Sequence, residues 1–519
     1  MRRIGIDVGG TNTDAVLIED GRVAAAVKAP TSADVTGGIV DALARLGAAT
    51  PLAAVRIDAV MIGTTHFMNA VVERRQLRPV AALRLGLPAS ASLPPFCDWP
   101  ADLRLLVEGG VWMVEGGHEY DGRPFMPFDA EGVRRAGREM RAKGLTSVAI
   151  SGIFSPLDPS HERHAAAILA EELPGAFITC SADLGRIGLL ERENAGLLNA
   201  ALADLARSTI AVFAAAIRGC GITAPLFITQ NDGTVADAAQ AMRLPVYSFA
   251  SGATNSMRGG AYLSGLEEAM VIDVGGTTSD VGQLRNGFPR EANSVVTVGG
   301  VRTLFRMPDI LSIGLGGGSQ VSLEPLRIGP QSLGYRLTSD AIAFGGTQLT
   351  TCDVAVAAGL IEIGERARVA HLSGARSVRV LDEVKRMIEE NVDRMKSEAG
   401  DVELIAVGGG AFLVPERLAG VARVVRVAHG ECANAVGAAI AQVSGEVDQV
   451  FRDLSRSEAL GNARRMAEKR AVAAGANPAT LKTVECEDIP LAYLPGQCLR
   501  VRVRVVGDVA PRASLQQES

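Results

Sequence analysis

The chain has 519 residues and a mass of 54.1 kDa, which is enough for two or three domains with sizeable hydrophobic cores. Its net charge of -6 and isoelectric point near 5.7 argue against a surface for nucleic acid or for anionic membranes. Seven cysteines without a Cys-x-x-Cys pair indicate neither a disulfide framework nor a zinc site, and they fit a cytoplasmic protein.

The N-terminal segment predicts a strand that runs into a glycine-rich turn. The run from Arg3 to Ile6 enters the motif DVGGTNTD at residues 7–14, and Asp20-Gly21 marks a tight turn between strands at 15–19 and 22–28. Because the chain enters this strand directly, no signal peptide is predicted. Backbone N–H groups exposed by glycine form concavities suited to anions, and threonine hydroxyls can donate to phosphate oxygens. The predicted phosphate-binding residues of this loop are Gly9, Gly10, Thr11, Asn12 and Thr13.

Polar residues follow the next predicted strand, which runs from Val60 to Gly63. The loop there is Thr64-Thr65-His66, and a helix containing Asn69 comes next. Polar side chains just past a strand end are where α/β proteins place ligand contacts. Substrate contacts are therefore predicted at Thr64, Thr65, His66 and Asn69, with a capping or surface role as the alternative for His66.

The rest of the first half alternates between irregular and helical segments. Residues 86–128 are rich in proline, glycine and aromatic residues, which indicates an insertion at the substrate mouth, at a subunit contact or on the surface. A helix over 129–143 and a strand over 147–154 follow, and a long helix over 189–218 connects the two halves. Charged residues interrupt its apolar part, so no membrane span is expected.

Two more predicted strands end in polar loops. Pro225 to Thr229 leads into a loop with Asp232, and Val246 to Ala250 leads into a loop that begins at Ser251. Asp232 and Ser251 are candidate substrate contacts, and turn formation is the alternative reading of both loops.

The motif DVGGTTSD at residues 273–280 repeats the first motif almost letter for letter. Asn286-Gly287 lies as far beyond Asp273 as Asp20-Gly21 lies beyond Asp7, so the hairpin is repeated as well. An accidental turn has no reason to recur together with its aspartates, so the repeat predicts two half-sites for one phosphate ligand. The residues of the second loop are Gly275, Gly276, Thr277 and Thr278.

Four aspartates belong to this duplicated pattern. Asp7 and Asp273 end their strands beside the predicted phosphates, where carboxylates can hold the waters of a Mg²⁺ ion that bridges those phosphates. They are the predicted metal-binding and catalytic residues. Asp14 and Asp280 end the two loops, where they are candidates for base or metal support and could instead only brace the turns.

The second half holds a third glycine-rich strand end. A strand over 402–407 runs into Gly408, Gly409 and Gly410, which predicts close approach of adenine or ribose, with tight packing as the alternative. The segment 312–320 is a hinge, a nucleotide contact or a bare turn. Helices are predicted around Pro415, near 433–443 and over the charged segment 446–474. The alternating residues 483–506 predict a strand whose arginines form a solvated face or a protein interface.

In this order the motifs resemble the actin-like ATPase fold of sugar kinases and heat-shock chaperones. Loops 7–14 and 273–280 resemble its two phosphate motifs, residues 408–411 its adenosine motif, and the helices around 191–199 and 433–443 its connecting motifs. More narrowly, the chain resembles the A subunits of the hydantoinase/oxoprolinase family over most of residues 1–440. The motifs concerned are DVGGTNTD, GTTHFMNAVVE (63–73), QNDGT (230–234), SGATNSMRGGAYL (251–263), DVGGTTSD and GLGGGS.

The resemblance implies a two-lobed α/β fold of the ribonuclease H-like type with duplicated βββαβαβα units, an inserted subdomain and a small C-terminal α+β region. The expected domains are an N-terminal lobe at 1–190, a connecting helix and second lobe at 191–445, and a C-terminal region at 446–510. The chain departs from the family in its shorter length, in Ala253 where many members have proline, and in His66-Phe67-Met68. These departures leave the substrate open and the nucleotide site intact.

The resemblance also implies the function. Members of the family use ATP and Mg²⁺ to open cyclic amides or imides such as hydantoins and 5-oxoproline, usually with a B-subunit partner. We therefore expect an ATP-dependent hydrolase subunit that phosphorylates the carbonyl oxygen of its substrate and works in the cytoplasm with a B subunit or as a homo-oligomer. A small-molecule kinase and an ATPase switch acting on a partner protein are the alternatives.

Overall fold

Two sheets with one shared strand order form the centre of the computed structural model, which describes residues 1–9, 12–30, 35–50, 56–185, 187–292, 295–491 and 498–510. The first sheet runs β3 (Arg22–Pro30), β2 (Asn12–Glu19), β1 (Arg2–Val8), β4 (Ala59–Thr64) and β9 (Leu226–Thr229). The second runs β13 (Phe288–Pro289), β12 (Ser279–Arg285), β11 (Ala269–Val274), β19 (Val402–Val407) and β20 (Val421–Arg426). β16 (Ile310–Ile313) also pairs with β12. The duplication predicted from the two motifs is thus a duplication of topology.

The two hairpins that carry the motifs share their register and their turns. β1 and β2 pair antiparallel with Asp7 opposite Asp14, and β11 and β12 pair in the same way with Asp273 opposite Asp280. At the next turns, Asp20 and Gly21 have φ of 48° and 78°, and Asn286 and Gly287 have φ of 52° and 73°. Two successive residues in the left-handed region are typical of the turns that match the twist of a β-hairpin, which is why Asp-Gly and Asn-Gly stand there.

Helices cover the outer faces of both sheets and fill the space between them. Apolar residues of α1 (Val35–Ala49) and α7 (Ala203–Gly219) pack on the first sheet, and those of α11 (Thr351–Ala358) and α12 (Ala375–Met395) pack on the second. α9 (Ser251–Ser264) packs on the second sheet and α13 (Ala433–Ile440) on the first. α9 and α13 cross at Gly259 and Gly437, where a Cβ atom would collide with the backbone of the other helix.

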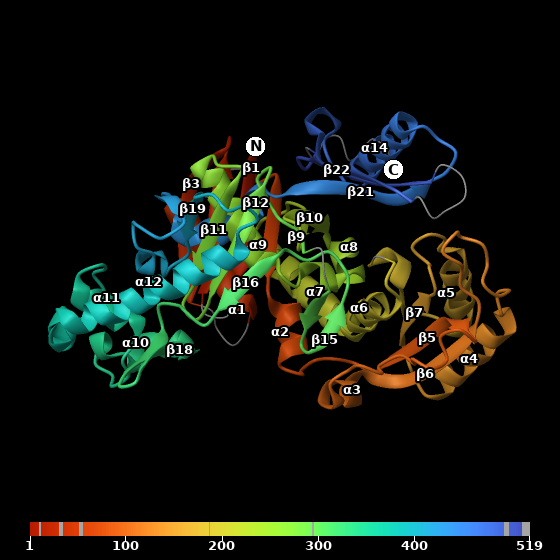
Figure 1. Cartoon of the computed structure of the whole chain (residues 1–519), viewed down its shortest axis with the longest axis horizontal. Coiled ribbons are helices and arrows are strands. Elements are labelled where there is room, and N and C mark those ends of the chain that lie inside the picture. Colours follow the sequence, from red (N-terminus) through yellow and green to blue (C-terminus); the bar gives the residue numbers. More distant parts are fainter. Residues whose placement is uncertain are drawn as a thin grey trace.

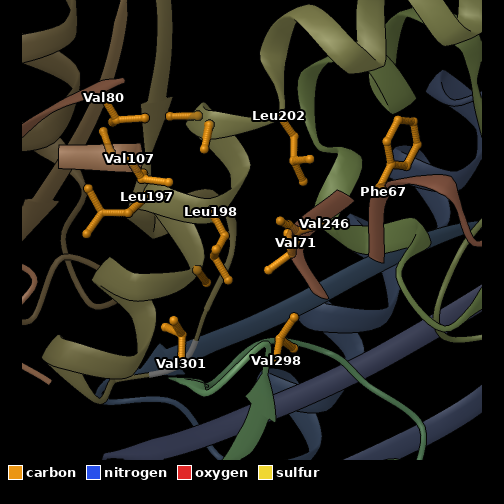
Figure 2. Packing of buried hydrophobic residues seen from close by; sticks show 14 of the residues in the cluster. Phe67, Val71, Val80, Val107, Leu197, Leu198, Leu202, Val246, Val298 and Val301 are labelled. Atoms are coloured by element: carbon orange, nitrogen blue, oxygen red, sulfur yellow. The ribbon is translucent and has the colours of Figure 1, made fainter. Parts of the chain in front are cut away.

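A parallel sheet interrupts the first lobe after α2 (His66–Val72). Its order is β6 (Glu108–Glu115), β5 (Val80–Leu87), β7 (Ser147–Gly152) and β8 (Phe177–Cys180), with α3 (Ala101–Val107), α4 (Ala130–Ala142) and α5 (Ser160–Glu172) in the same segment. This subdomain contains most of the predicted insertion 86–128 and continues beyond it. Figure 2 shows the core that joins it to the lobes, where Val80, Leu197 and Val298 come from three distant parts of the chain.

The C-terminal region extends the first sheet to nine strands. β10 (Thr234–Asp237) pairs with β9, followed by β21 (Gln442–Phe451), β23 (Leu499–Gly507) and β22 (Lys482–Pro490), while α14 (Arg456–Ala473) packs on β21 and β23. Figure 1 shows β21 reaching from the central sheets to α14. The prediction of helix from residue 446 is wrong up to Phe451, because pairing with β23 buries alternate residues of this strand. The expected domain bounds stay predictions. Strand β21 of this sheet begins before the expected bound at residue 445 and ends after it.

The arginines of β23 are buried within the chain, so the expectation of a solvated face or a protein interface is wrong for two of them. Arg502 and Arg504 are 8% and 4% exposed. Arg504 Nη1 lies 3.2 Å from Asp232 Oδ2 and 3.4 Å from Glu291 Oε1, and Arg502 Nε lies 3.1 Å from Glu446 Oε1. Carboxylates from remote segments neutralise these guanidinium groups, which an alternating pattern cannot reveal.

Three other local predictions were wrong. The predicted strand 246–250 is a 3₁₀ helix over Pro245–Ser248, because Pro245 has no N–H for a sheet. The helix predicted around Pro415 is a single 3₁₀ turn over Ala411–Leu413. The long helix over 189–218 breaks into α6 (Leu189–Ala201) and α7. No single helix in the described ranges has the length and apolar character to cross a membrane; the α6–α7 pair, bent by 53°, meets both criteria only when taken together.

The remaining elements are short. They are the hairpins β14 (Val296–Val298) with β15 (Val301–Thr303) and β17 (Ser319–Leu323) with β18 (Leu326–Ser332), and the helices α8 (Ala238–Arg243) and α10 (Leu337–Asp340).

Candidate nucleotide site

A cavity of about 1030 Å³ separates the two duplicated hairpins and is lined by both of them. From the first repeat it receives Asp7, Gly9, Asn12 and Asp14, and from the second Asp273, Gly275, Gly276, Thr277 and Thr278. Gly408, Gly409 and Gly410 line the same cavity. The structure therefore brings together the three glycine-rich strand ends predicted from the sequence, whereas Gly10 and Thr11 lie outside the described residues and Thr13 is fully buried in β2.

The two loops have matching backbone geometry. Gly9 N donates to Asn12 O at 3.1 Å in the first loop, and Gly275 N donates to Thr278 O at 2.9 Å in the second. The segment 312–320 supports the second loop, because Gly317 N and Gly318 N donate to the carbonyl oxygens of Gly275 and Gly276. A Cβ atom on Gly316 would lie within 2.6 Å of Gly276 and Thr277. Close packing behind the second loop explains most of this run of glycines, and Gly317 also lines the cavity.

The third glycine-rich turn packs against the second loop as well. Gly408 has φ of 88°, and Gly410 N donates to Val274 O at 2.7 Å. Beside it the cavity wall becomes apolar, with Phe412, Ile361, Ile363 and the ring of Tyr335. An apolar wall next to glycine backbone suits a flat base, whereas the two loops offer N–H and hydroxyl groups.

Asp7 and Asp273 lie at the ends of β1 and β11 in the floor of the cavity, where Asp7 is buried and Asp273 is partly buried. Asp7 is 5% exposed; its Oδ2 accepts a hydrogen bond of 2.9 Å from Asn434 Nδ2, and its Oδ1 has no partner among the described residues. Burial, with repulsion from Asp14 and Asp273, raises the pKa of Asp7 to about 7. Burial also raises the pKa of Asp273, against a hydrogen bond from Ser256. Both carboxyls are thus poised to receive a positive charge.

Asp14 and Asp280 each contact the strand opposite them. Burial raises the pKa of Asp14, although the ammonium of Lys28 opposes this shift from 2.6 Å. Burial likewise raises the pKa of Asp280 to about 6, against a hydrogen bond donated by Ser312. Asp14 lines the cavity, whereas the described lining does not include Asp280.

The six candidate substrate residues divide into three groups. Thr65 and Asn69 line the cavity on the side of the first lobe. Thr64 and Ser251 lie just behind it, where Ser251 Oγ donates to Thr64 O at 3.1 Å and joins the end of β4 to the start of α9. His66, whose pKa burial lowers, and Asp232 lie outside the described lining of this cavity.

Asp232 lies instead at the centre of an ion-pair cluster. Burial alone would raise its pKa, but Arg306 Nη1 at 2.5 Å and Arg504 Nη1 at 3.2 Å hold the pKa of this carboxyl well below its usual range. Three parts of the chain meet there: the loop after β9, the segment between β15 and β16, and β23.

Several cavity residues were not predicted from the sequence. Lys28, Ser256, Glu431 and Asn434 all contribute to the lining. Asn434 was predicted only to open a helix, and its contact with Asp7 spans 427 residues of sequence. The hairpin predicted from the sequence does not place Lys28 opposite Asp14, because that pairing depends on a β-bulge between Leu17 and Ile18 that shifts the register of β2 and β3.

A duplicated hairpin that presents paired glycine loops and aspartates to one interlobe cavity defines a nucleotide-dependent protein with the actin-like ATPase fold. Models of the hydantoinase/oxoprolinase N-terminal region and of hydantoinase/oxoprolinase match residues 3–173 and 192–366. The chain belongs to the hydantoinase/oxoprolinase family, which confirms the resemblance found in its motifs.

The relatives and solved structures agree with this assignment. The chain is 26% identical to the caprolactamase subunit alpha of Pseudomonas jessenii, over 83% of this chain and 69% of that one. It is 25% identical to the acetophenone carboxylase gamma subunit of Aromatoleum aromaticum, over 70% of this chain but only 53% of that subunit.

Two solved structures share the fold. The ATP-dependent caprolactamase from Pseudomonas jessenii superposes with a TM-score of 0.77 at 21% identity, covering 97% of this chain and 87% of that chain. Nucleotide-free acetone carboxylase superposes with a TM-score of 0.67 at 18% identity, covering 98% of this chain and 89% of that chain. The predicted two-lobed fold is confirmed.

Proposed function

We propose that this chain is the ATP-dependent subunit of a hydrolase that opens a cyclic amide or imide by phosphorylating its carbonyl oxygen. The observation that carries the proposal is the pair of loops, 7–14 and 273–280, facing each other across one cavity with an aspartate at the end of each strand. The relative named caprolactamase supports a lactam as the substrate class.

Mg²⁺ fits the oxygen donors at the floor of the cavity. Asp7 Oδ1 is buried without a hydrogen-bond partner in the described chain, as expected of an oxygen that faces a cation or its waters. No group of three metal-ligating side chains converges among the described residues, and Mg²⁺ bound to nucleotide typically uses one or two carboxylates together with phosphates and water. Asp7 and Asp273 would hold the ion, which when bound neutralises charge on the phosphates during transfer.

The residues of the cavity divide the work of such a reaction. The backbone N–H groups of Gly276 and Thr277 lie where they can stabilise charge that spreads over the transferring phosphoryl group. The lactam oxygen attacks the terminal phosphorus of ATP as the bond to ADP breaks. Phosphorylation turns this oxygen from a poor leaving group into a good one. Water then attacks the activated carbon, and the C–N bond opens as the ring nitrogen takes a proton. This leaves an acyl phosphate, which a second water hydrolyses to release phosphate. Thr65 and Asn69 line the first-lobe side, where we place the substrate.

Relatives named as carboxylase subunits favour a second candidate. The compounds in the names of these subunits, acetophenone and acetone, share the carbonyl group with a lactam but lack the amide. ATP-dependent activation of a ketone oxygen in the same cavity is therefore the alternative. Because these relatives and the caprolactamase are named as subunits, we also propose that this chain works with a partner subunit.

Phosphate release from MgATP tests the proposal. The purified chain, alone and co-expressed with its genomic neighbours, is assayed against hydantoins, 5-oxoproline, larger lactams, imides and methyl ketones. We expect a cyclic amide to stimulate release by at least about tenfold, with ring-opened product in equal amount. Asp273→Asn should abolish the stimulation, and Asp382→Asn on the exposed face of α12 should retain it. Stimulation by ketones alone would establish the alternative, and release without any small substrate would favour an ATPase switch.

A further inference from the structure

The two repeats differ in the residue that faces the aspartate at the end of each loop. In both, the aspartate that ends the loop pairs with a residue on a neighbouring strand: Asp14 of β2 stands opposite Lys28 of β3, and Asp280 of β12 stands opposite Ser312 of β16. The side chains meet as well, because Lys28 Nζ donates to both oxygens of Asp14 at 2.6 and 2.8 Å, and Ser312 Oγ donates to Asp280. A cation in the first repeat thus corresponds to a neutral hydroxyl in the second.

The charge of the cavity makes this difference important. Four carboxyl groups line it, those of Asp7, Asp14, Asp273 and Glu431, and a triphosphate adds further negative charge. Lys28 is the sole lysine or arginine that the structure places in this lining. Its charge acts on Asp7 and on Asp273, so it lies within electrostatic reach of both half-sites.

The ammonium of Lys28 also has a donor to offer. A lysine has three N–H donors, and here two are directed at Asp14. The third makes a long contact of 3.3 Å with Glu431 O at the start of α13. The side chain remains 36% exposed, and a phosphate oxygen is a stronger acceptor than a backbone carbonyl. Asp14 therefore orients the ammonium, and an incoming anion can take the weakly used donor.

We propose that Lys28 contacts the terminal phosphoryl group of ATP, so that the first repeat distinguishes ATP from ADP. This inference rests on the nucleotide site of the proposed function and names the residue that recognises the phosphoryl group to be transferred. The second repeat, with Ser312 at the corresponding position, carries no such charge and serves the phosphates that ATP and ADP share.

Nucleotide binding to matched variants tests the inference without any lactam. Dissociation constants of MgADP and of a non-hydrolysable MgATP analogue are measured by calorimetry for the full chain and for Lys28→Met, Lys28→Arg and Ser312→Ala. We expect K28M to weaken the ATP analogue by about 30-fold and ADP by no more than about threefold, as for loss of one charged hydrogen bond. K28R should recover most of the loss, and S312A should keep the wild-type ratio of the two constants.

The outcomes separate this inference from the proposed function. Equal weakening of both nucleotides in K28M would assign Lys28 a structural role through Asp14 and overturn the inference, as would a change of ratio in S312A. Thermal denaturation of each variant shows whether it is folded. If K28M is not folded, the ratio of the two dissociation constants is compared between K28R and the wild type. If no cyclic amide stimulates phosphate release but K28M loses the preference for the ATP analogue, the proposed substrate fails while the role of Lys28 stands.

Discussion

At the scale of single residues, the floor of the cavity is destabilised by its own charges. Asp7 is buried beside Asp14 and Asp273, its carboxylate accepts a single hydrogen bond from the described residues, and it lines the cavity. Such strain is common where a protein must hold a cation or shift a proton, because a satisfied carboxylate would have no use for either. Nucleotide and cation binding should therefore stabilise this protein more than its contacts alone suggest.

The pKa of Asp7 predicts a pH-dependent stability. An aspartate ionises near pH 4 in the unfolded chain but only at about 7 in the folded one, so the wild type loses stability as the pH rises from about 4 to about 7. Asp7→Asn removes that loss. Relative to wild type, its free energy of unfolding should rise by on the order of 2 kcal/mol between pH 5 and pH 8. Urea denaturation without nucleotide or Mg²⁺ measures this difference. A constant difference between variant and wild type would contradict it, and Asp382→Asn is the exposed control.

At the scale of elements, the contact between α9 and α13 sets the distance between the two sheets. Gly259 lies against the backbone of Ala433, Gly437 lies against that of Asn255, and Gly5 of β1 lies against Ala435. Each position lacks room for a Cβ atom, so the helices approach more closely than side chains normally allow. Because α9 begins at Ser251 and α13 carries Asn434, this contact also aligns the polar groups around Asp7.

Adding one methyl group at this crossing should be costly. Gly259→Ala would place its Cβ into the carbonyl of Ala433, and we expect a loss of about 2–3 kcal/mol in stability together with weaker nucleotide binding. Gly219→Ala at the end of α7 is the matched control, because its Cβ would meet no atom within 4 Å. The control should be neutral or slightly stabilising, since alanine favours helix over glycine. Chemical denaturation and ADP titration measure both effects, and equal behaviour of the two variants would refute the role of the crossing.

At the scale of the whole molecule, one ion-pair cluster joins parts that lie far apart in the sequence. Arg306, between β15 and β16, contacts Asp232 in the loop after β9 and Glu446 of β21, and Arg504 of β23 contacts Asp232 as well. The cluster lies on the first sheet where β10 and β21 pair, at the base of the C-terminal region (Figure 1). Removal of one member leaves buried charge without compensation, because each carboxylate of the cluster faces at least one guanidinium group.

Asp232→Asn should therefore destabilise the chain by about 3–5 kcal/mol at pH 7. The pKa of Asp232 is lowered in the folded state, so its contribution is present above the usual aspartate pKa and is lost as the pH falls. The difference in free energy of unfolding between variant and wild type should accordingly become smaller below about pH 4. Urea denaturation at pH 7, 5 and 3.5 measures it, with the exposed Glu487→Gln on β22 as the control. A gap independent of pH would show that the charge of Asp232 is not what stabilises the cluster.

The sequence by itself determined the nucleotide half-sites, because strand, glycine-rich turn and hairpin are each encoded within about a dozen residues and the repeat of the pattern revealed their pairing. Only the tertiary structure decided the rest of the site. The turn at Asp20-Gly21 alone would place Val27 opposite Asp14; a bulge between Leu17 and Ile18 shifts the register and brings Lys28 there instead. Asn434 reaches Asp7, and Asp232 joins Arg504, only through long-range packing, and residues 446–451 form a strand because β23 lies beside them. Local chemistry predicts turns and the groups they expose, whereas register, burial and the partner of a charge depend on segments hundreds of residues away.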